Sequence, residues 1–404
     1  MNKLLFIISL VSLLAIMLQL FNQPSPGLFV VYDVAESRFE NLKPETAAKT
    51  KNSSTNVFLL TDFASHESTP EVHSAAAIEL ADNNIMAFWY GGTREGHKDV
   101  NIYKNTWHNS QQQWGEESTI TTRLQTRDGT SRYIRKLGNP VVSRGPDDSI
   151  WLFYVSVSIG GWAGSAINLI ISYDEGDSWS PAKRLITSPF LNISTLLKGS
   201  PIHYADGSIG LPVYHEFLGK FSELLRLDSS GNVIDKTRLS WGKTSLQPII
   251  VPFTSTQALS MMRYHGSSPY RILSQYTNDS GLSWSAVEKT TLPNPNAGIH
   301  AIQLADGQLL LAFNNHEDER EDMTLAISGN QAKSWEIKKV IEKYHLKKPD
   351  NSKQFSYPWL LQTKNGNIHL LYTWHKSHIK HKVFNQQWLE STELPTNINT
   401  GGVQ

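Results

Sequence analysis

An eight-residue pattern, [ST]-x-[DN]-x-[GA]-x-S-W, recurs along this 404-residue chain and restricts the folds open to it. Clear copies occupy residues 172–179 and 277–284, and a weaker copy occupies residues 328–335. With three fainter echoes, the third position of the pattern falls at residues 109, 174, 229, 279, 330 and 383, at steps of 65, 55, 50, 51 and 53. A period near 50 residues is typical of solenoids and propeller blades.

The sequence around each copy predicts β-strands. Residues 167–172, 270–276 and 323–328 are rich in β-branched and aromatic side chains and lead directly into the pattern. Asp-Gly at 306–307 and Asn-Gly at 365–366 separate apolar runs, which is a strong hairpin pattern. We therefore predict an all-β fold: a six-bladed β-propeller of four-stranded antiparallel blades over residues 57–404.

Ring closure is predicted from the two ends of this region. Few residues follow Trp388, and Pro395 and a Gly-Gly pair make them poor strand material. Residues 57–63 (VFLLTDF) look like a strand with no partner ahead of the first blade. We expect them to supply the outer strand of the last blade.

The N-terminus has the features of an export sequence. Lys3 precedes an apolar run over residues 4–21, which we interpret as part of a signal peptide or signal anchor over residues 1–21. Residues 22–56 are polar and rich in Pro, Lys and Glu, and we expect a linker. The body is then extracytoplasmic: periplasmic, secreted, or tethered to the membrane through residues 4–21.

Composition removes several classes of function. Lys plus Arg and Asp plus Glu both number 37, so no basic excess favours nucleic acid as a partner. The chain has no cysteine, which excludes disulfides and thiolate chemistry. His369, His375, His378 and His381 are interleaved with lysines, and we interpret them as a solvated face. We expect no metal and no cofactor.

The repeated pattern resembles the Asp box of the sialidase (BNR-repeat) superfamily, and in particular bacterial sialidase-like BNR proteins. The resemblance runs from about residue 57 to residue 388 and includes residues 73–75 (HSA), 89–96 (WYGGTREG), 138–140 (GNP), 292–296 (LPNPN), 356–358 (SYP), 372–374 (YTW) and 379–381 (IKH). It implies a substrate site on the ring axis at one face, lined by the starts of the innermost strands and the loops between second and third strands. The Asp boxes themselves are then structural turns remote from that site.

The resemblance also implies that arginines hold the substrate carboxylate. Arg263 and Arg320 match the second and third family arginines in position, and a guanidinium can bond both oxygens of a carboxylate at once. His73 stands where the family has its first arginine. Either Arg94 supplies the missing cation from the next loop, or His73 replaces it as a pH-dependent donor.

The remaining roles follow from the same resemblance. Tyr357 matches the family's nucleophilic tyrosine, and Glu216 is the candidate base beside it. Glu95 and Asp99 fall in the first-blade loop where the family acid lies. The other expected substrate contacts are Trp162, as a platform for a sugar ring, with His300 and His316.

Together these features predict an exported, monomeric glycoside hydrolase, similar to exo-α-sialidases, that removes a terminal acidic sugar such as sialic acid from a glycan. Two alternatives remain open. The ring histidines and arginines also suit a lyase or another glycosidase acting on an acidic, uronate-containing polysaccharide. A propeller that binds glycans without turnover is the other alternative.

Overall fold

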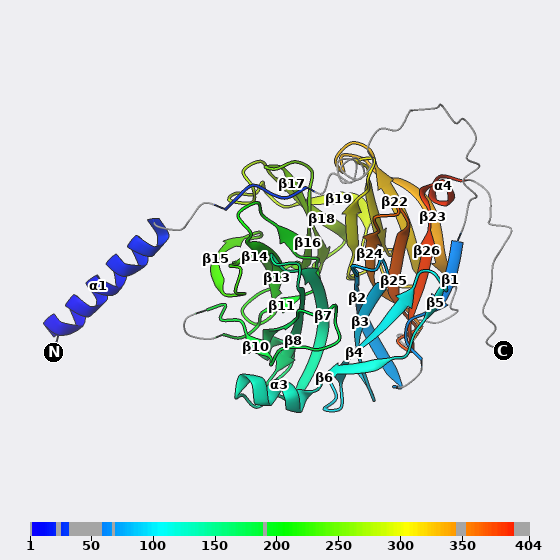
Figure 1. Cartoon of the computed structure of the whole chain (residues 1–404). Helices are drawn as coiled ribbons and strands as arrows, with labels where there is room; N and C mark the ends of the chain where they lie inside the picture. The colour runs from blue at the N-terminus through cyan, green and yellow to red at the C-terminus, as the bar shows by residue number, and fades with distance from the viewer. Residues whose placement is uncertain are drawn as a thin grey trace, which may run out of the picture.

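Six antiparallel sheets surround a common axis in the computed structural model, which describes residues 2–21, 26–31, 59–66, 69–188, 192–344 and 353–391 (Figure 1). Neighbouring sheets contact each other through their innermost strands all the way around the ring. The predicted six-bladed propeller is therefore confirmed. Two blades exceed the predicted four strands, because β6 adds to β4 in the first and the inner strand of the third is split into β11 and β12.

The blades follow one another in chain order, each running from its innermost strand outward. Blade one comprises β2 (Glu71–Glu79), β3 (Ile85–Gly92), β4 (Asn101–His108), β5 (Gln113–Trp114) and β6 (Ser118–Thr121), and blade two comprises β7 (Lys136–Arg144), β8 (Ile150–Val157), β9 (Ser165–Ser172) and β10 (Lys183–Arg184). Blade three comprises β11 (Leu196–Leu197), β12 (Ile202–His203), β13 (Ile209–His215), β14 (Phe221–Leu227) and β15 (Val233–Arg238), and blade four comprises β16 (Ser245–Pro252), β17 (Ala258–Tyr264), β18 (Arg271–Thr277) and β19 (Glu288–Pro293). Blade five comprises β20 (His300–Gln303), β21 (Leu309–Phe313), β22 (Asp322–Ser328) and β23 (Glu336–Lys343), and blade six comprises β24 (Phe355–Gln362), β25 (Ile368–Trp374) and β26 (His378–Phe384).

Burial falls from the axis outward, which explains the strand sequences. Every residue of β8 is buried, since both faces of its sheet pack against neighbouring blades. The outer strand β23 is exposed or half-buried throughout and reads EIKKVIEK. A fully buried strand favours an unbroken apolar run, whereas a rim strand tolerates charge.

The last blade is closed by the start of the propeller chain. β1 (Leu59–Phe63) pairs antiparallel with β26, and Leu59 lies opposite Phe384. In Figure 1 the blue β1 accordingly lies beside the red β26. The predicted closure is thus confirmed for residues 59–63, while residues 57 and 58 lie outside the described residues.

The Asp boxes form self-contained turns. In the copy at 277–284, Asp279 Oδ1 accepts bonds from Thr277 Oγ1 at 2.8 Å and from the backbone N–H of Ser283 at 2.9 Å, and Trp284 Nε1 donates to the carbonyl of Gly281 at 3.1 Å. The copy at 172–179 repeats the same bonds, and in the weaker copy Asn330 takes the acceptor role. The repeated pattern therefore reflects turn geometry.

The segment ahead of the propeller has two described parts. α1 (Asn2–Phe21) is a 20-residue helix drawn apart from the ring in Figure 1. By length and hydropathy, no helix in the described ranges qualifies as a membrane span. Within the expected linker, residues 26–31 are bound to the ring: Phe29 is buried against Tyr204 and its N–H donates to the carbonyl of Ser255 at 2.7 Å. The rest of that linker, 22–25 and 32–56, lies outside the described residues.

The C-terminal histidines differ from expectation. His369 and His381 are buried, stack on each other and are joined through Nδ1 and Nε2 at 3.0 Å. The solvated-face interpretation is therefore wrong for these two. Both side chains point from β25 and β26 into a blade interface, where His381 also meets the ring of Trp107.

Candidate functional site

A repeated backbone irregularity marks the innermost strands. Ser74, Asn139, Gln247 and Tyr357 all have positive φ, between 40° and 60°, and each lies at a register shift in its strand pairing. A non-glycine residue pays about 1–2 kcal/mol for this conformation, and such strain is typical of functional sites. A bulge also redirects side chains.

Two arginines from adjacent blades meet at Asn296. Arg263 Nε donates to Asn296 Oδ1 at 2.7 Å, and Arg320 Nη2 donates to the Asn296 carbonyl at 2.6 Å. Burial and then the nearby charge of Arg263 lower the pKa of Arg320. Within the described residues, neither guanidinium forms an ion pair with a carboxylate. Two close, half-buried cations without an anion are a site for one.

Tyr357 lies beside this pair. Gln247 Nε2 donates to the Tyr357 hydroxyl at 3.5 Å and to the Tyr214 hydroxyl at 3.4 Å, while Gln247 Oε1 accepts from Arg263 Nη1 at 3.3 Å. The Lys198 ammonium lies 6.0 Å from the centre of the Tyr357 ring, and burial lowers the pKa of Lys198 to about 7. The tyrosine is therefore held by an amide and has cations on two sides.

His73 completes the central group. Its ring stands edge-on to that of Tyr357, with centroids 4.5 Å apart, and its Nδ1 is 3.0 Å from Thr373 Oγ1. Burial, then the charges of Arg320, Lys376, Lys198 and Arg263, hold the pKa of His73 well below 6.5. At neutral pH His73 is thus an uncharged imidazole.

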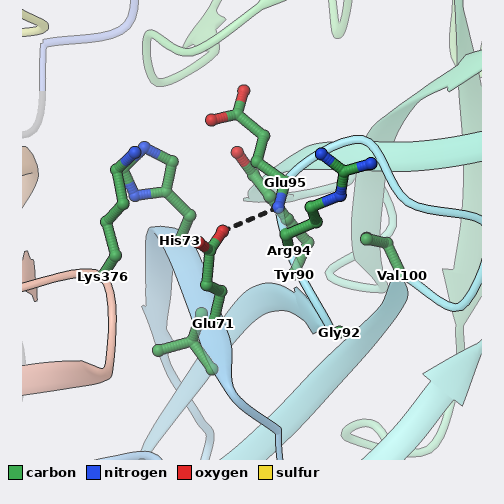
Figure 2. A pocket seen from close by; sticks show the side chains of 9 residues that line it. Glu71, His73, Tyr90, Gly92, Arg94, Glu95, Val100 and Lys376 are labelled. Carbon is green, nitrogen blue, oxygen red and sulfur yellow. Dashed lines mark hydrogen bonds between the residues drawn. The ribbon is translucent and has the colours of Figure 1, made fainter. Parts of the chain in front are cut away.

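A crevice opens beside His73. Figure 2 shows His73 and Lys376 on one side of it and Arg94 on the other, with the Glu95 side chain between them. Glu71 Oε2 accepts the backbone N–H of Glu95 at 2.7 Å and so fixes the loop. The crevice therefore has two cations, Arg94 and Lys376, available near the position of the missing arginine. Lys376 sits in a tight turn with His375, both at positive φ, and its carbonyl accepts from Val72 N–H at 2.7 Å.

The two acid candidates differ in their surroundings. Slight burial tends to raise the pKa of Asp99, but bonds from the Thr93 hydroxyl and N–H and from His97 bring it to about 2. An acid with this pKa is ionised at neutral pH and has no proton to give. Glu95 is exposed in the crevice and close enough to influence the pKa of Arg320. Of the two candidates, only Glu95 lines the crevice beside His73.

Glu216 does not line this crevice, but it lies near enough to Tyr214 for its charge to act on that side chain. Its charge helps to raise the pKa of Tyr214, after burial and Tyr357, and it also acts on His265. Its backbone N–H donates to Ser194 Oγ at 2.9 Å. Across the described ranges, no hydrogen bond joins the Glu216 carboxylate to the Tyr357 hydroxyl.

Three expected substrate contacts lie outside the central group. His300 is buried, and because its Nδ1 accepts from Leu360 N–H at 3.1 Å, its Nε2 carries the proton toward Ser200 Oγ at 2.7 Å. The exposed His316 accepts two backbone N–H groups of its own loop at Nδ1. Trp162 packs under the Lys136 ammonium, 3.9 Å from the ring centre.

Besides Asn296, Gln247 and Lys198, four residues around the crevice received no role from the sequence. They are Glu71, Tyr90, Tyr214 and Lys376. Tyr90 and Tyr214 lie within apolar strands, so their sequence context is that of aromatic core residues. Lys376 is in a His-Lys turn that lacks the Asn-Gly pattern of a tight hairpin.

The BNR repeat-like domain family matches residues 83–370, which is most of the propeller. The chain belongs to the BNR repeat-like domain family. No curated protein matches the sequence significantly. This BNR repeat-like chain also resembles solved structures at low sequence identity.

Three such structures indicate the range of similar propellers. The Hadza microbial sialidase Hz136 is 14% identical at a TM-score of 0.64, over 79% of this chain and 66% of that one. The intramolecular trans-sialidase from Ruminococcus gnavus, in complex with oseltamivir carboxylate, is 14% identical at 0.63, over 84% and 98%. The Penicillium chrysogenum α-L-arabinanase, complexed with arabinobiose, is 12% identical at 0.55, over 81% and 97%. At these identities the likeness shows the fold of the BNR repeat-like chain.

Proposed function

We propose that this protein is a glycoside hydrolase that removes a terminal acidic sugar, sialic acid or a similar carboxylate-bearing sugar, from a glycan. The observation that carries the proposal is the pair Arg263 and Arg320, held on Asn296 next to Tyr357 and, among the residues that the structure describes, without a carboxylate partner. The likeness to propellers named sialidase and arabinanase supports a glycosidase of this kind.

The proposed reaction assigns one task to each group. Arg263 and Arg320 bind the carboxylate, and Tyr357 attacks the anomeric carbon. A phenol in place of a carboxylate nucleophile avoids repulsion by the anionic sugar, but it must lose its proton during attack. We assign that proton to Glu216, whose charge acts on the neighbouring Tyr214. Glu95 donates a proton to the departing oxygen from the crevice. Water, deprotonated by Glu95, then displaces Tyr357 from the sugar, and Tyr357 recovers its proton from Glu216. Among the described residues, Trp162, His300 and His316 make no hydrogen bond or ring contact with these groups, so their contacts with the substrate stay predictions.

The groups facing the Tyr357 hydroxyl favour a second candidate as well. Gln247, its hydrogen-bond partner, is an amide and does not accept a proton, whereas the adjacent His73 is a neutral imidazole. Arginines that neutralise a uronate carboxylate make its neighbouring C–H more acidic, and a neutral imidazole or a phenolate can remove that proton. An elimination on uronate-containing polysaccharide would use the same site.

Product analysis tests the two candidates together. The full chain is incubated with a sialoside, a glucuronide and a uronate polysaccharide, and the products are separated. A free acidic sugar supports hydrolysis, and an unsaturated uronate absorbing in the ultraviolet supports elimination. Loss of either activity in Arg320→Ala, with Arg271→Ala active, ties it to this site, because Arg271 is instead paired with Glu317. Binding of the acidic sugar without any product would identify a glycan-binding propeller and refute the enzyme.

We also propose that the protein acts outside the cytoplasm. Lys3 followed by the apolar α1 supports export, with residues 4–21 as a signal or tether. Fractionation of cells producing the full chain tests this proposal, and recovery of the whole chain from the cytosol would overturn it.

A further inference from the structure

A second, more open hollow adjoins the central crevice. It has a volume of about 700 Å³, within the range of ligand sites. Loop residues after β3, the segment around α3 (Arg123–Thr130) and the start of β7 line it. Its charged and aromatic lining consists of Arg94, Glu95, His97, Lys98, Arg123, Tyr133, Arg135 and Lys136.

The hollow is strongly cationic. Five Arg and Lys side chains face a single carboxylate, that of Glu95. In the described part of the chain none of the five forms an ion pair within 4.0 Å, although Glu95 influences the pKa of Lys136 after burial. Because the whole chain has a net charge of zero, this cluster is a local feature. Like charges gathered without counter-ions repel one another, so an anion bound there would be favoured.

The segment that carries these cations is well ordered by its own contacts. Thr122 Oγ1 accepts the Gln125 N–H at 3.2 Å and Gln125 Oε1 accepts the Thr122 N–H at 2.9 Å, which caps α3. Buried Thr126 bonds the Tyr154 hydroxyl at 2.8 Å and anchors the helix to β8. Tyr133 is 65% exposed at the rim, where an aromatic ring can stack on a sugar.

The two hollows share Arg94 and Glu95. We propose that the outer hollow binds anionic groups, sulfate or carboxylate, on the sugars that follow the terminal residue of an acidic glycan. This inference rests on the proposed function, because it places the remainder of the substrate beyond Glu95, the proposed donor to the departing oxygen. A glycan that is acidic along its length would then be preferred over one with a single acidic end.

Direct binding tests this without requiring turnover. The full chain is titrated with a sulfated chondroitin tetrasaccharide, its desulfated and carboxyl-reduced counterpart, which carries no charge, and a single-stranded DNA of matched charge. The test variant is Arg123→Ala with Arg135→Ala. The control, Arg127→Ala with Arg132→Ala, removes the same charge from the same segment outside the hollow.

We expect the wild type to bind the sulfated chain in preference to both comparison ligands. The test variant should lose about tenfold in affinity, as two partly exposed ion pairs predict, and the control should stay near wild type. In an Arg263→Ala, Arg320→Ala background, which lacks the proposed contacts to the terminal carboxylate, adding Arg123→Ala with Arg135→Ala should still lower the remaining affinity about tenfold, so the outer hollow can be tested even if the enzyme proposal fails. Equal losses in test and control variants, equal binding of the uncharged chain, or equal binding of DNA would overturn the inference.

Discussion

Gln247 and Tyr357 face each other from blades four and six with the same backbone conformation, φ 51° and 52°, and the Gln247 amide donates to the Tyr357 hydroxyl at 3.5 Å. Two strand bulges, 110 residues apart in the chain, thus direct their side chains to one point. The same amide accepts a bond from Arg263, which links the nucleophile candidate to the anion pocket.

Tyr357→Phe tests the nucleophile. The substitution removes one hydroxyl, so we expect at least about a hundredfold loss in kcat, with stability changed by less than about 1.5 kcal/mol. Affinity for the acidic sugar should persist, since Arg263 and Arg320 remain. Steady-state kinetics and a binding titration measure the two effects, and undiminished turnover would remove Tyr357 from the mechanism.

Gln247→Glu tests whether the amide limits hydrolysis. A carboxylate at this position would accept the phenolic proton and would still bond Arg263. We expect hydrolysis to rise, with a new acidic limb in its pH profile that Gln247→Ala does not show. If Gln247→Glu loses hydrolysis as fully as Gln247→Ala, the amide has a different role.

Buried histidines predict acid sensitivity of the fold. Burial lowers the pKa of His73, His300, His369 and His381, to about 3 for His369. Below the unfolded value of about 6.5 the unfolded chain therefore binds more protons than the folded one. These histidines should leave the free energy of unfolding unchanged above about pH 6.5 and lower it below that pH, by about 1.4 kcal/mol per pH unit for each histidine.

Urea unfolding at several pH values measures this slope. His300→Gln should reduce it by about one proton, and a slope unchanged in that variant would show that His300 is protonated in the fold. The substitution also disturbs the hydrogen bonds of His300 with Ser200 and Leu360 and so lowers stability at every pH. The slopes of the two proteins are therefore compared after their unfolding free energies have been matched above pH 7.

Asp279→Ala tests the role of the repeated turn. The change removes acceptors for Thr277 and Ser283, so we expect a loss of about 1–2 kcal/mol in unfolding free energy. Sugar binding should be unchanged. A tenfold loss of binding in the folded variant would mean that this Asp box contributes to the site.

The sequence repeats and the hairpin motifs predicted the six sheets and the closing strand, because sheets and strands of this kind depend on local sequence patterns. Residues 59–63 have a strand-like sequence of their own. In the structure they supply the fourth strand of the last blade, which takes only three strands from the C-terminal part of the chain. By contrast α3 has no apolar periodicity, and its residues 123–130 resemble a polar loop. The helix depends on its Thr122-x-x-Gln125 capping box, a short pattern that the sequence does carry, and on the bond of Thr126 to Tyr154, which no local pattern reveals.

The candidate site was predicted in part. The family motif placed Arg263, Arg320 and Tyr357, which the structure brings together around Asn296 and Gln247. Glu216 and His316 were chosen because of the loops in which they lie. The direction in which a loop side chain points depends on its own hydrogen bonds, such as the one that His316 Nδ1 accepts from the backbone of its loop, and the sequence does not reveal these bonds. Lys376 depends on the closure of the ring, which brings its turn against β2.

The central claim is that Arg263 and Arg320 form a carboxylate pocket. Isothermal titration of the full chain with sialic acid and glucuronic acid, and with their methyl esters, measures it directly. We predict that one acid binds at least about tenfold tighter than its ester, that this preference disappears in Arg263→Ala with Arg320→Ala, and that Arg271→Ala keeps it. An acid preference that survives loss of both arginines, or no preference in the wild type, would contradict the account.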